Sequence, residues 1–105
     1  MMEISKKDWK LFRSKIGDWQ ERYMEKLCKE YMELLSGPEL ASDKFWELEK
    51  RIKKDRKRPG VILEMNKQDM AWDIVTLIKD KVITLDDLEE FSDDLKQTVE
   101  FIMNR

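Results

Sequence analysis

Residues 5–35 read SKKDWKLFRSKIGDWQERYMEKLCKEYMELL, and this stretch decides the fold. Its apolar residues recur at positions 9, 12, 16, 19, 23, 27, 31 and 34, a spacing of three and four that is typical of one face of an α-helix. Ser5 stands three residues before Asp8, a variant of the capping box that predicts a helix start. The chain is therefore expected to begin with an amphipathic helix of about 31 residues.

The length of this helix raises a question about its continuity. An unbroken helix would be about 46 Å long, whereas a compact domain of this size is about 33 Å across. Gly17 followed by Asp18, with Glu21 three residues on, offers a break and a fresh N-cap, so we favour a kink or short joint at Gly17. The alternative is a straight helix whose overhang a second subunit covers, because the apolar stripe continues in phase through Gly17.

Two clusters, Gly37-Pro38 and Pro59-Gly60, divide the chain into three helical blocks. The second block is expected to begin with Ser42 as its N-cap and to run to about Lys57. Its apolar face is expected to be buried and consists of Phe45, Leu48 and Ile52.

The last third of the chain predicts short helices. Residues 61–65 are expected to form a helical turn leading into an Asn66 cap, since no second strand exists to pair with them. Thr84 with Asp87, and then Ser92, predict a short helix at about 85–91 and a final one at about 93–103. The whole pattern predicts an all-α fold, a small bundle of about four to five helices in a single domain, residues 1–105. The third block has its apolar face at Met70, Ile74, Leu77 and Ile78.

Composition excludes several classes of protein. Hydrophobic residues make up 41% of the chain and include ten aromatics, enough for a packed core. Charged residues reach 42% but nearly cancel, with a net charge of −2, so the overall balance signals no polyanion partner. Cys28 is the single cysteine and there is no His, which argues against a disulfide or an ordinary zinc site. We therefore expect a cytoplasmic protein with no metal, no cofactor and no membrane span.

The basic segment, residues 50–58, carries seven cations in nine positions. Clustered Lys and Arg suit the phosphates of nucleic acid. They would equally suit an acidic protein partner, or form a solvated helix end that complements the helix dipole, with Glu47/Arg51 and Glu49/Lys53 as ion pairs. The candidate binding residues of this segment are Lys50, Arg51, Lys53, Lys54, Arg56, Lys57 and Arg58.

The acidic segment, residues 86–94, carries six carboxylates in nine positions. Residues 61–105 hold eleven acidic and five basic side chains, a net charge of −6, against +4 for residues 1–60. Most of these acids would lie in the first helical turns that follow the caps Thr84 and Ser92, where the helix dipole favours negative charge. The remaining interpretations are docking on a basic surface, which includes mimicry of a nucleic-acid backbone, and neutralisation of the chain's own basic segment. No spacing for a calcium loop or a catalytic carboxylate pair is present. The candidate residues are Asp86, Asp87, Glu89 and Glu90.

Trp46 and Cys28 have sequence neighbours that predict their exposure. Trp46 is expected to be partly exposed and to contribute to an interface, because Phe45 and Leu48 already supply a buried stripe. Cys28 is flanked by Lys26 and Lys29, but no acid or His completes a nucleophile, so a packed thiol is favoured.

Four stretches carry a resemblance to a known group of proteins: WKLFR at 9–13, SDKFWELEKRI at 42–52, PGV at 59–61 and ITLDDLEEFSDDLK at 83–96. Together they resemble a group of short proteins from gut-dwelling Gram-positive bacteria, often carried on phage-like or conjugative elements. Some members bear the label multidrug transporter, which the absence of any apolar span of about 20 residues argues against. The resemblance implies a mobile-element accessory protein, for example an inhibitor of a host defence nuclease such as an anti-CRISPR protein.

The leading hypothesis is a non-catalytic protein that binds a macromolecular partner, most readily another protein, through Trp46 and the basic segment or through the acidic segment. The alternative is a nucleic-acid-binding regulator that uses residues 50–58. An enzyme is not expected, and the sequence leaves a homo-oligomer open.

Overall fold

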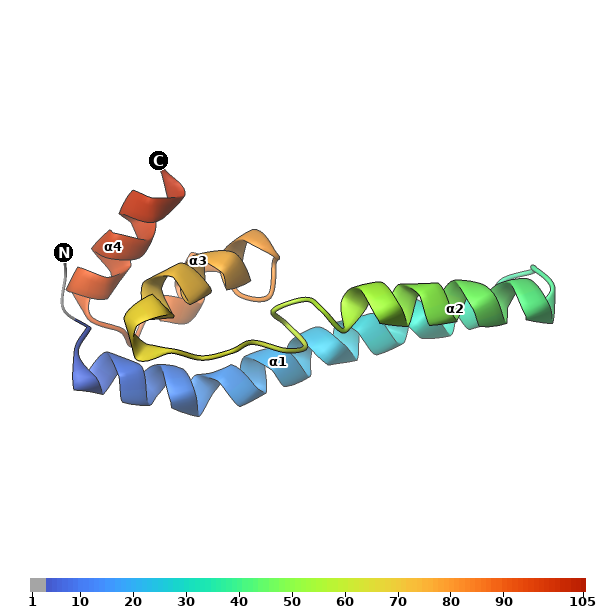
Figure 1. Ribbon diagram of the computed structural model, residues 1–105, viewed down its shortest axis with the longest axis horizontal. Helices are drawn as coiled ribbons and strands as arrows, with labels where there is room; N and C mark the ends of the chain where they lie inside the picture. Colours follow the sequence, from blue (N-terminus) through green and yellow to red (C-terminus); the bar gives the residue numbers. More distant parts are fainter. Residues whose placement is uncertain (1–3) are drawn as a thin grey trace.

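The computed structural model describes residues 4–105, and over this range the chain is entirely helical between its loops (Figure 1). The all-α prediction and the long first helix are confirmed. The helices in chain order are α1 Lys6–Leu35, α2 Ala41–Asp55, the 3₁₀ turn η1 Lys67–Asp69, α3 Met70–Lys79, the 3₁₀ turn η2 Leu85–Leu88 and α4 Asp93–Met103.

The first half of α1 contributes its apolar stripe to the hydrophobic core. Ser5 caps the helix as predicted, its hydroxyl accepting the Asp8 backbone N–H at 3.0 Å. The Asp8 carboxylate accepts the backbone N–H of Ser92 at 3.0 Å and the Ser92 hydroxyl as well, which ties the start of α1 to the start of α4. The predicted apolar stripe is buried at Phe12, Ile16, Trp19, Tyr23 and Leu27, in the same core cluster as the buried residues of α3, η2 and α4.

The short joint considered at Gly17 is wrong, because α1 continues through this residue without a fresh cap, whereas a kink within the continuous helix stays a prediction. Gly17 is exposed, while Ile16 and Trp19 are buried, so core contacts on both sides outweigh the roughly 1 kcal/mol that a mid-helix glycine costs. The expectation of a break rested on a compact shape. The molecule instead measures 54 × 27 × 22 Å and has a radius of gyration of 16.8 Å, so there is room for a helix of 30 residues.

The second half of α1 and α2 form a helical hairpin that extends away from the rest of the molecule (Figure 1). We call residues 28–55 the arm and the remainder the body. The turn at residues 36–40 leads into α2, whose N-cap is Leu40 without a side-chain hydrogen bond, so the prediction of Ser42 as the N-cap is wrong. The buried stripe predicted for α2 is also wrong, since Phe45 and Ile52 are 62% and 44% exposed.

Residues 56–66 return along α1 to the body, and Figure 1 shows this segment running beside the helix. A Cβ on Gly60 would lie 2.3 Å from the Tyr23 ring, so this close approach requires glycine. The helical turn expected at 61–65 is wrong. The segment is irregular and extended, and Val61, Leu63 and Met65 alternate towards the core with exposed residues between them.

Short helices held by caps complete the body. Asn66 accepts the Gln68 backbone N–H at 3.0 Å and Ser92 accepts the Leu95 backbone N–H at 3.2 Å, as the sequence predicted. The short helix expected at 85–91 is a 3₁₀ turn that ends at Leu88. The fully buried side chains of α3, η2 and α4 are Met70, Ile74, Leu77, Leu88, Leu95 and Val99.

Candidate functional site

Part of the basic segment holds the arm to α1. The Arg51 guanidinium donates to Glu30 at 2.8 Å and lies 5.6 Å from the centre of the Tyr31 ring. Arg51 therefore pairs with α1 rather than with Glu47, the partner expected from the sequence. Arg58 donates to Asp80 at 2.8 Å, which joins the end of α2 to the end of α3.

Asp55 is the centre of this network and is only 4% exposed. One oxygen accepts the Tyr31 hydroxyl at 2.6 Å and lies 3.7 Å from Arg51, and the other accepts from Arg58 at 3.4 Å. Burial and the hydrogen bond to Asp55 raise the pKa of Tyr31 to about 12, so its hydroxyl stays protonated and donates. The roles of Asp55 and Tyr31 as hydrogen-bond partners were not predicted from the sequence. The Arg51–Asp55 spacing of four residues was the available signal.

The other cations of the basic segment face solvent. Lys53 pairs with Glu49 at 3.1 Å, the one predicted ion pair that is confirmed. Lys50, Lys54, Arg56 and Lys57 are exposed. About half of the predicted basic patch is thus available to a partner, while Arg51 and Arg58 are already neutralised by carboxylates of the same chain.

Trp46 is 64% exposed, in agreement with the prediction, but the reason given for it does not hold. Phe45 is exposed as well, and the two rings contact edge to face with their centres 4.9 Å apart. Indole rings are found at interface hot spots because they bury a large area at low cost in side-chain entropy. An exposed Trp with an aromatic neighbour is therefore a site where a partner would gain contact area.

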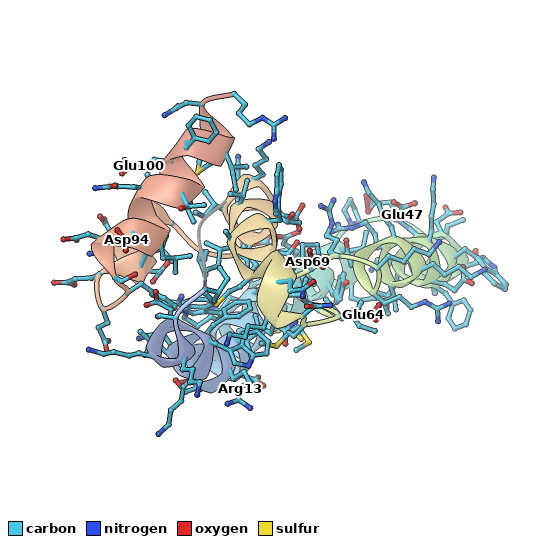
Figure 2. All side chains as sticks on the ribbon, turned by 60° about the vertical axis from the view of Figure 1, so that its left-hand side comes forward. Arg13, Glu47, Glu64, Asp69, Asp94 and Glu100 are labelled. Carbon is cyan, nitrogen blue, oxygen red and sulfur yellow. The ribbon has the colours of Figure 1, made fainter. Side chains whose placement is uncertain are left out.

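A shallow groove of about 540 Å³ runs beside Trp46 on the arm. It brings together two of the predicted binding residues, Trp46 and Lys50. Figure 2 shows Glu47, another of its lining residues, on the arm, far from Asp94 and Glu100 on α4. The groove combines an apolar floor with two cations and three carboxylates, and its lining residues are Leu34, Glu39, Asp43, Lys44, Trp46, Glu47 and Lys50.

The acidic segment lies on the body and not beside the groove (Figure 1). The Asp87 carboxylate accepts the Thr84 backbone N–H at 2.8 Å and lies 3.4 Å from Arg22. Glu90 pairs with Lys15 at 2.9 Å. These two carboxylates therefore attach η2 and the turn after it to α1, whereas Asp86 and Glu89 are exposed. The structure does not bring the acidic and basic segments together into one surface.

The packed thiol expected at Cys28 is wrong, because Cys28 is exposed. It lies one position beyond Leu27, the last buried residue of the α1 stripe, and so on the neighbouring face of the helix. In the described part of the chain, no three acidic, Cys or His side chains are grouped closely enough to hold a metal ion. None of the helices within residues 4–105 has the length and apolar character needed to cross a membrane.

Comparison of the chain with protein-family models, with curated proteins and with solved structures finds no match. The groove and the exposed surfaces of the arm are the structural features that bear on function.

Proposed function

We propose that this protein is a non-catalytic interaction protein that binds a protein partner through the groove of the arm. The observation that carries the proposal is Trp46, which is 64% exposed on a groove that also contains Lys50. The Trp46 ring and the apolar lining of the groove can bind an apolar side chain of the partner, and Lys50 can pair with one of its carboxylates.

The charges of the groove favour protein over nucleic acid. Glu39, Asp43 and Glu47 line it together with Lys44 and Lys50, so a phosphate backbone laid there would meet three carboxylates. Arg51 and Arg58, the residues best suited to bidentate phosphate contacts, are occupied by Glu30, Asp55 and Asp80. A protein segment that carries both signs of charge matches such a surface better.

We further propose that the partner belongs to a host system with which a mobile element must contend, such as a defence nuclease, and that binding takes place in the cytoplasm. This part rests on the resemblance to small proteins of mobile elements. An inhibitor of this kind needs a rigid surface and no chemistry of its own, which a hairpin that projects from a packed body would provide.

Tagged co-purification from a native-like host, with and without nuclease treatment, tests the proposal. A protein captured by the unaltered chain should be retained after nuclease treatment and lost with Trp46→Ala or Lys50→Glu. The matched control is Trp72→Ala, which removes another exposed Trp, 50% exposed and located on the body. Capture that depends on Trp72 but not on Trp46 would contradict a site on the arm.

A nucleic-acid-binding regulator is the second candidate, favoured by the exposed cations Lys50, Lys54, Arg56 and Lys57 together with Lys53. If these five neutralise phosphates, the affinity should fall with salt at a slope of about −4 to −5 on a log-log plot. A gel-shift titration at low salt measures this slope. Absence of any shift would rule out this candidate and leave the protein partner.

A further inference from the structure

A polar pocket lies where the arm joins the body, and we call it the junction pocket. It has a volume of about 270 Å³, which is at the small end of ligand sites in proteins. Its lining comes from α1, from the end of α2 and from the end of α3, which meet over the middle of α1 (Figure 1). None of its lining residues lines the groove beside Trp46, so it is a separate site.

The three carboxylates that line the junction pocket are already bound by its two arginines. Arg51 donates to Glu30 at 2.8 Å and lies 3.7 Å from Asp55. Arg58 donates to Asp80 at 2.8 Å and to Asp55 at 3.4 Å. These contacts fix the walls of the pocket, because they join α1, α2 and the end of α3. They also leave no unpaired carboxylate for the other cations of the pocket.

Three lysines of the junction pocket have no such partner. Lys26 comes from α1, Lys54 from α2 and Lys81 from the turn after α3, and all three are exposed. Within residues 4–105, none of them forms an ion pair with a carboxylate. The pocket is lined by five cations and three carboxylates, so its net charge is +2. Positive charges held together in this way attract an anion.

Lys81 stands at a position where glycine is the usual residue. Its φ is 63°, and no other residue of the described chain has a positive φ. The backbone N–H groups of Lys81 and Val82 donate to Ile78 and Leu77, which is the Schellman ending of a helix, usually completed by glycine at this position. Lys79 already places a cation in the last turn of α3, so the helix dipole does not require a second one. A side chain kept in an unfavourable backbone conformation points to a role outside the fold.

The hydroxyl of Tyr23 is a hydrogen-bond donor with no acceptor among residues 4–105. Tyr23 is 8% exposed and lines the junction pocket. The charged groups that act on its hydroxyl are Asp80, Arg58, Asp55 and Glu30, and all four line the same pocket. Burial raises the pKa of Tyr23, so the hydroxyl keeps its proton and remains a donor. Because buried polar groups are normally hydrogen-bonded, an oxygen atom of a ligand would supply the acceptor that the chain does not.

We propose that the junction pocket binds the phosphate group of a small phosphorylated molecule. A phosphate monoester carries close to two negative charges at neutral pH and three acceptor oxygens, which match the excess charge and the donors of the pocket. Lys26, Lys54 and Lys81 pair with these oxygens, and Tyr23 donates to one of them. A carboxylate, with one charge and two oxygens, satisfies fewer of these donors. The proposal depends neither on the groove nor on a protein partner.

Calorimetric titration of the full chain with pyrophosphate, at constant ionic strength, tests the proposal. Pyrophosphate should bind at a single site per chain, whereas acetate should not bind. Inorganic phosphate and ADP are the further probes, and tighter binding of ADP than of pyrophosphate would assign an organic phosphate to the site. Absence of binding with all three phosphate compounds would overturn the proposal. Binding of a short oligonucleotide alone would also overturn it, since the cations would then serve nucleic acid.

Lys81→Gly separates binding from folding. Glycine suits the left-handed backbone, so the melting temperature of the variant should be equal to or higher than that of the unaltered chain. Its dissociation constant for pyrophosphate should nevertheless rise about tenfold, because a charge-assisted hydrogen bond is lost. A folded Lys81→Gly variant with unchanged affinity would overturn the proposal.

Tyr23→Phe tests the donor on the wall of the pocket. The variant keeps the ring and loses a hydroxyl that has no acceptor in the described chain, so its melting temperature should not change. Its dissociation constant for pyrophosphate should rise several-fold. Unchanged affinity in this variant would contradict the hydrogen bond from Tyr23.

Lys54→Ala and Lys50→Ala form a matched pair, because both lysines are exposed on α2 and only Lys54 lines the junction pocket. Lys54→Ala should raise the dissociation constant about tenfold. Lys50→Ala should change it less than about twofold, since salt screens a charge that does not contact the ligand. Equal weakening by the two variants would indicate diffuse attraction to the basic segment and overturn the proposal. Capture of a protein partner should show the reverse dependence, because Lys50 lines the groove.

Discussion

The body and the arm are both built from amphipathic helices, but they are stabilised by different interactions. In the body, α1 buries Phe12, Ile16 and Trp19 in the same core cluster as the buried residues of α3 and α4. In the arm, Asp55 with Tyr31, Arg51 and Arg58 attaches α2, while Phe45, Trp46 and Ile52 face solvent. Apolar burial is the larger stabilising term in proteins, and polar contacts mainly set position. The body therefore provides most of the stability, whereas the arm leaves several large apolar side chains exposed.

The largest difference is expected between two phenylalanines, one in each region. Phe12 is fully buried, so Phe12→Ala should lower the free energy of unfolding by about 3 to 5 kcal/mol. Phe45 is 62% exposed, so Phe45→Ala should lower it by less than about 0.5 kcal/mol at concentrations where the chain is monomeric. Urea denaturation measures both. Similar losses for the two variants would contradict the division into body and arm.

Removing the charge of Asp55 is expected to loosen the arm and leave the body intact. Asp55→Asn removes the negative partner of Arg51 and Arg58 and should weaken the attachment of α2 by about 2 kcal/mol, less than for a fully buried pair because both arginines reach solvent. Hydrogen exchange should speed up in α2 by about thirtyfold while α3 and α4 keep their protection. Equal acceleration in α3 would show that the two regions unfold as one unit.

Asp73 makes the stability of the body depend on pH. Burial, and then the nearby charge of Asp69, raise the pKa of Asp73 from 3.8 to about 6. Between these values the folded chain keeps a proton that the unfolded chain has lost, so stability falls as pH rises through this window. Because the carboxyl is only partly buried, solvent screening limits the effect to about 1 kcal/mol.

The measurement is urea denaturation from pH 4 to pH 7, compared with Asp73→Asn. The substitution should stabilise the protein at pH 7 and flatten its pH dependence across this window. A loss of stability at pH 7 would show that the ionised Asp73 carboxylate is favourable after all.

The smallest effect concerns Gly17, in the part of α1 that belongs to the body. A Cβ at Gly17 would meet no atom within 4 Å, so Gly17→Ala should raise the melting temperature and stabilise the helix by about 0.5 to 1 kcal/mol. Gly60→Ala is the contrasting variant, because its Cβ would collide with the Tyr23 ring. A destabilising Gly17→Ala would point to a bend that requires glycine.

Much of the local structure could be predicted from the sequence. The stripe from Phe12 to Leu27, the cap at Ser5 and the cap at Ser92 all depend on residues within one or two helical turns of one another. Local spacing is sufficient for such features because side chains three and four positions apart share a helical face. The start of α2 could not be predicted, since Leu40 precedes it without any side-chain hydrogen bond.

The candidate site was predictable only in part. Trp46 and Lys50 were selected from the sequence, and the groove brings them together. The roles of Arg51 and Arg58 depend on Glu30 and Asp80, which are 21 and 22 residues away from them. Whether a cation binds a partner or its own chain is decided by such distant groups, which no local pattern contains.

The sequence by itself determined that the chain is helical, where α1 and α4 begin and end, and which stripe of α1 is apolar. The tertiary structure alone decided which stripes are covered. α1 buries its stripe in the body, but α2 meets α1 through Arg51 and Asp55 and so turns Phe45 and Ile52 to solvent. The physical reason is that periodicity depends on neighbours along one helix, whereas burial depends on which face another helix contacts.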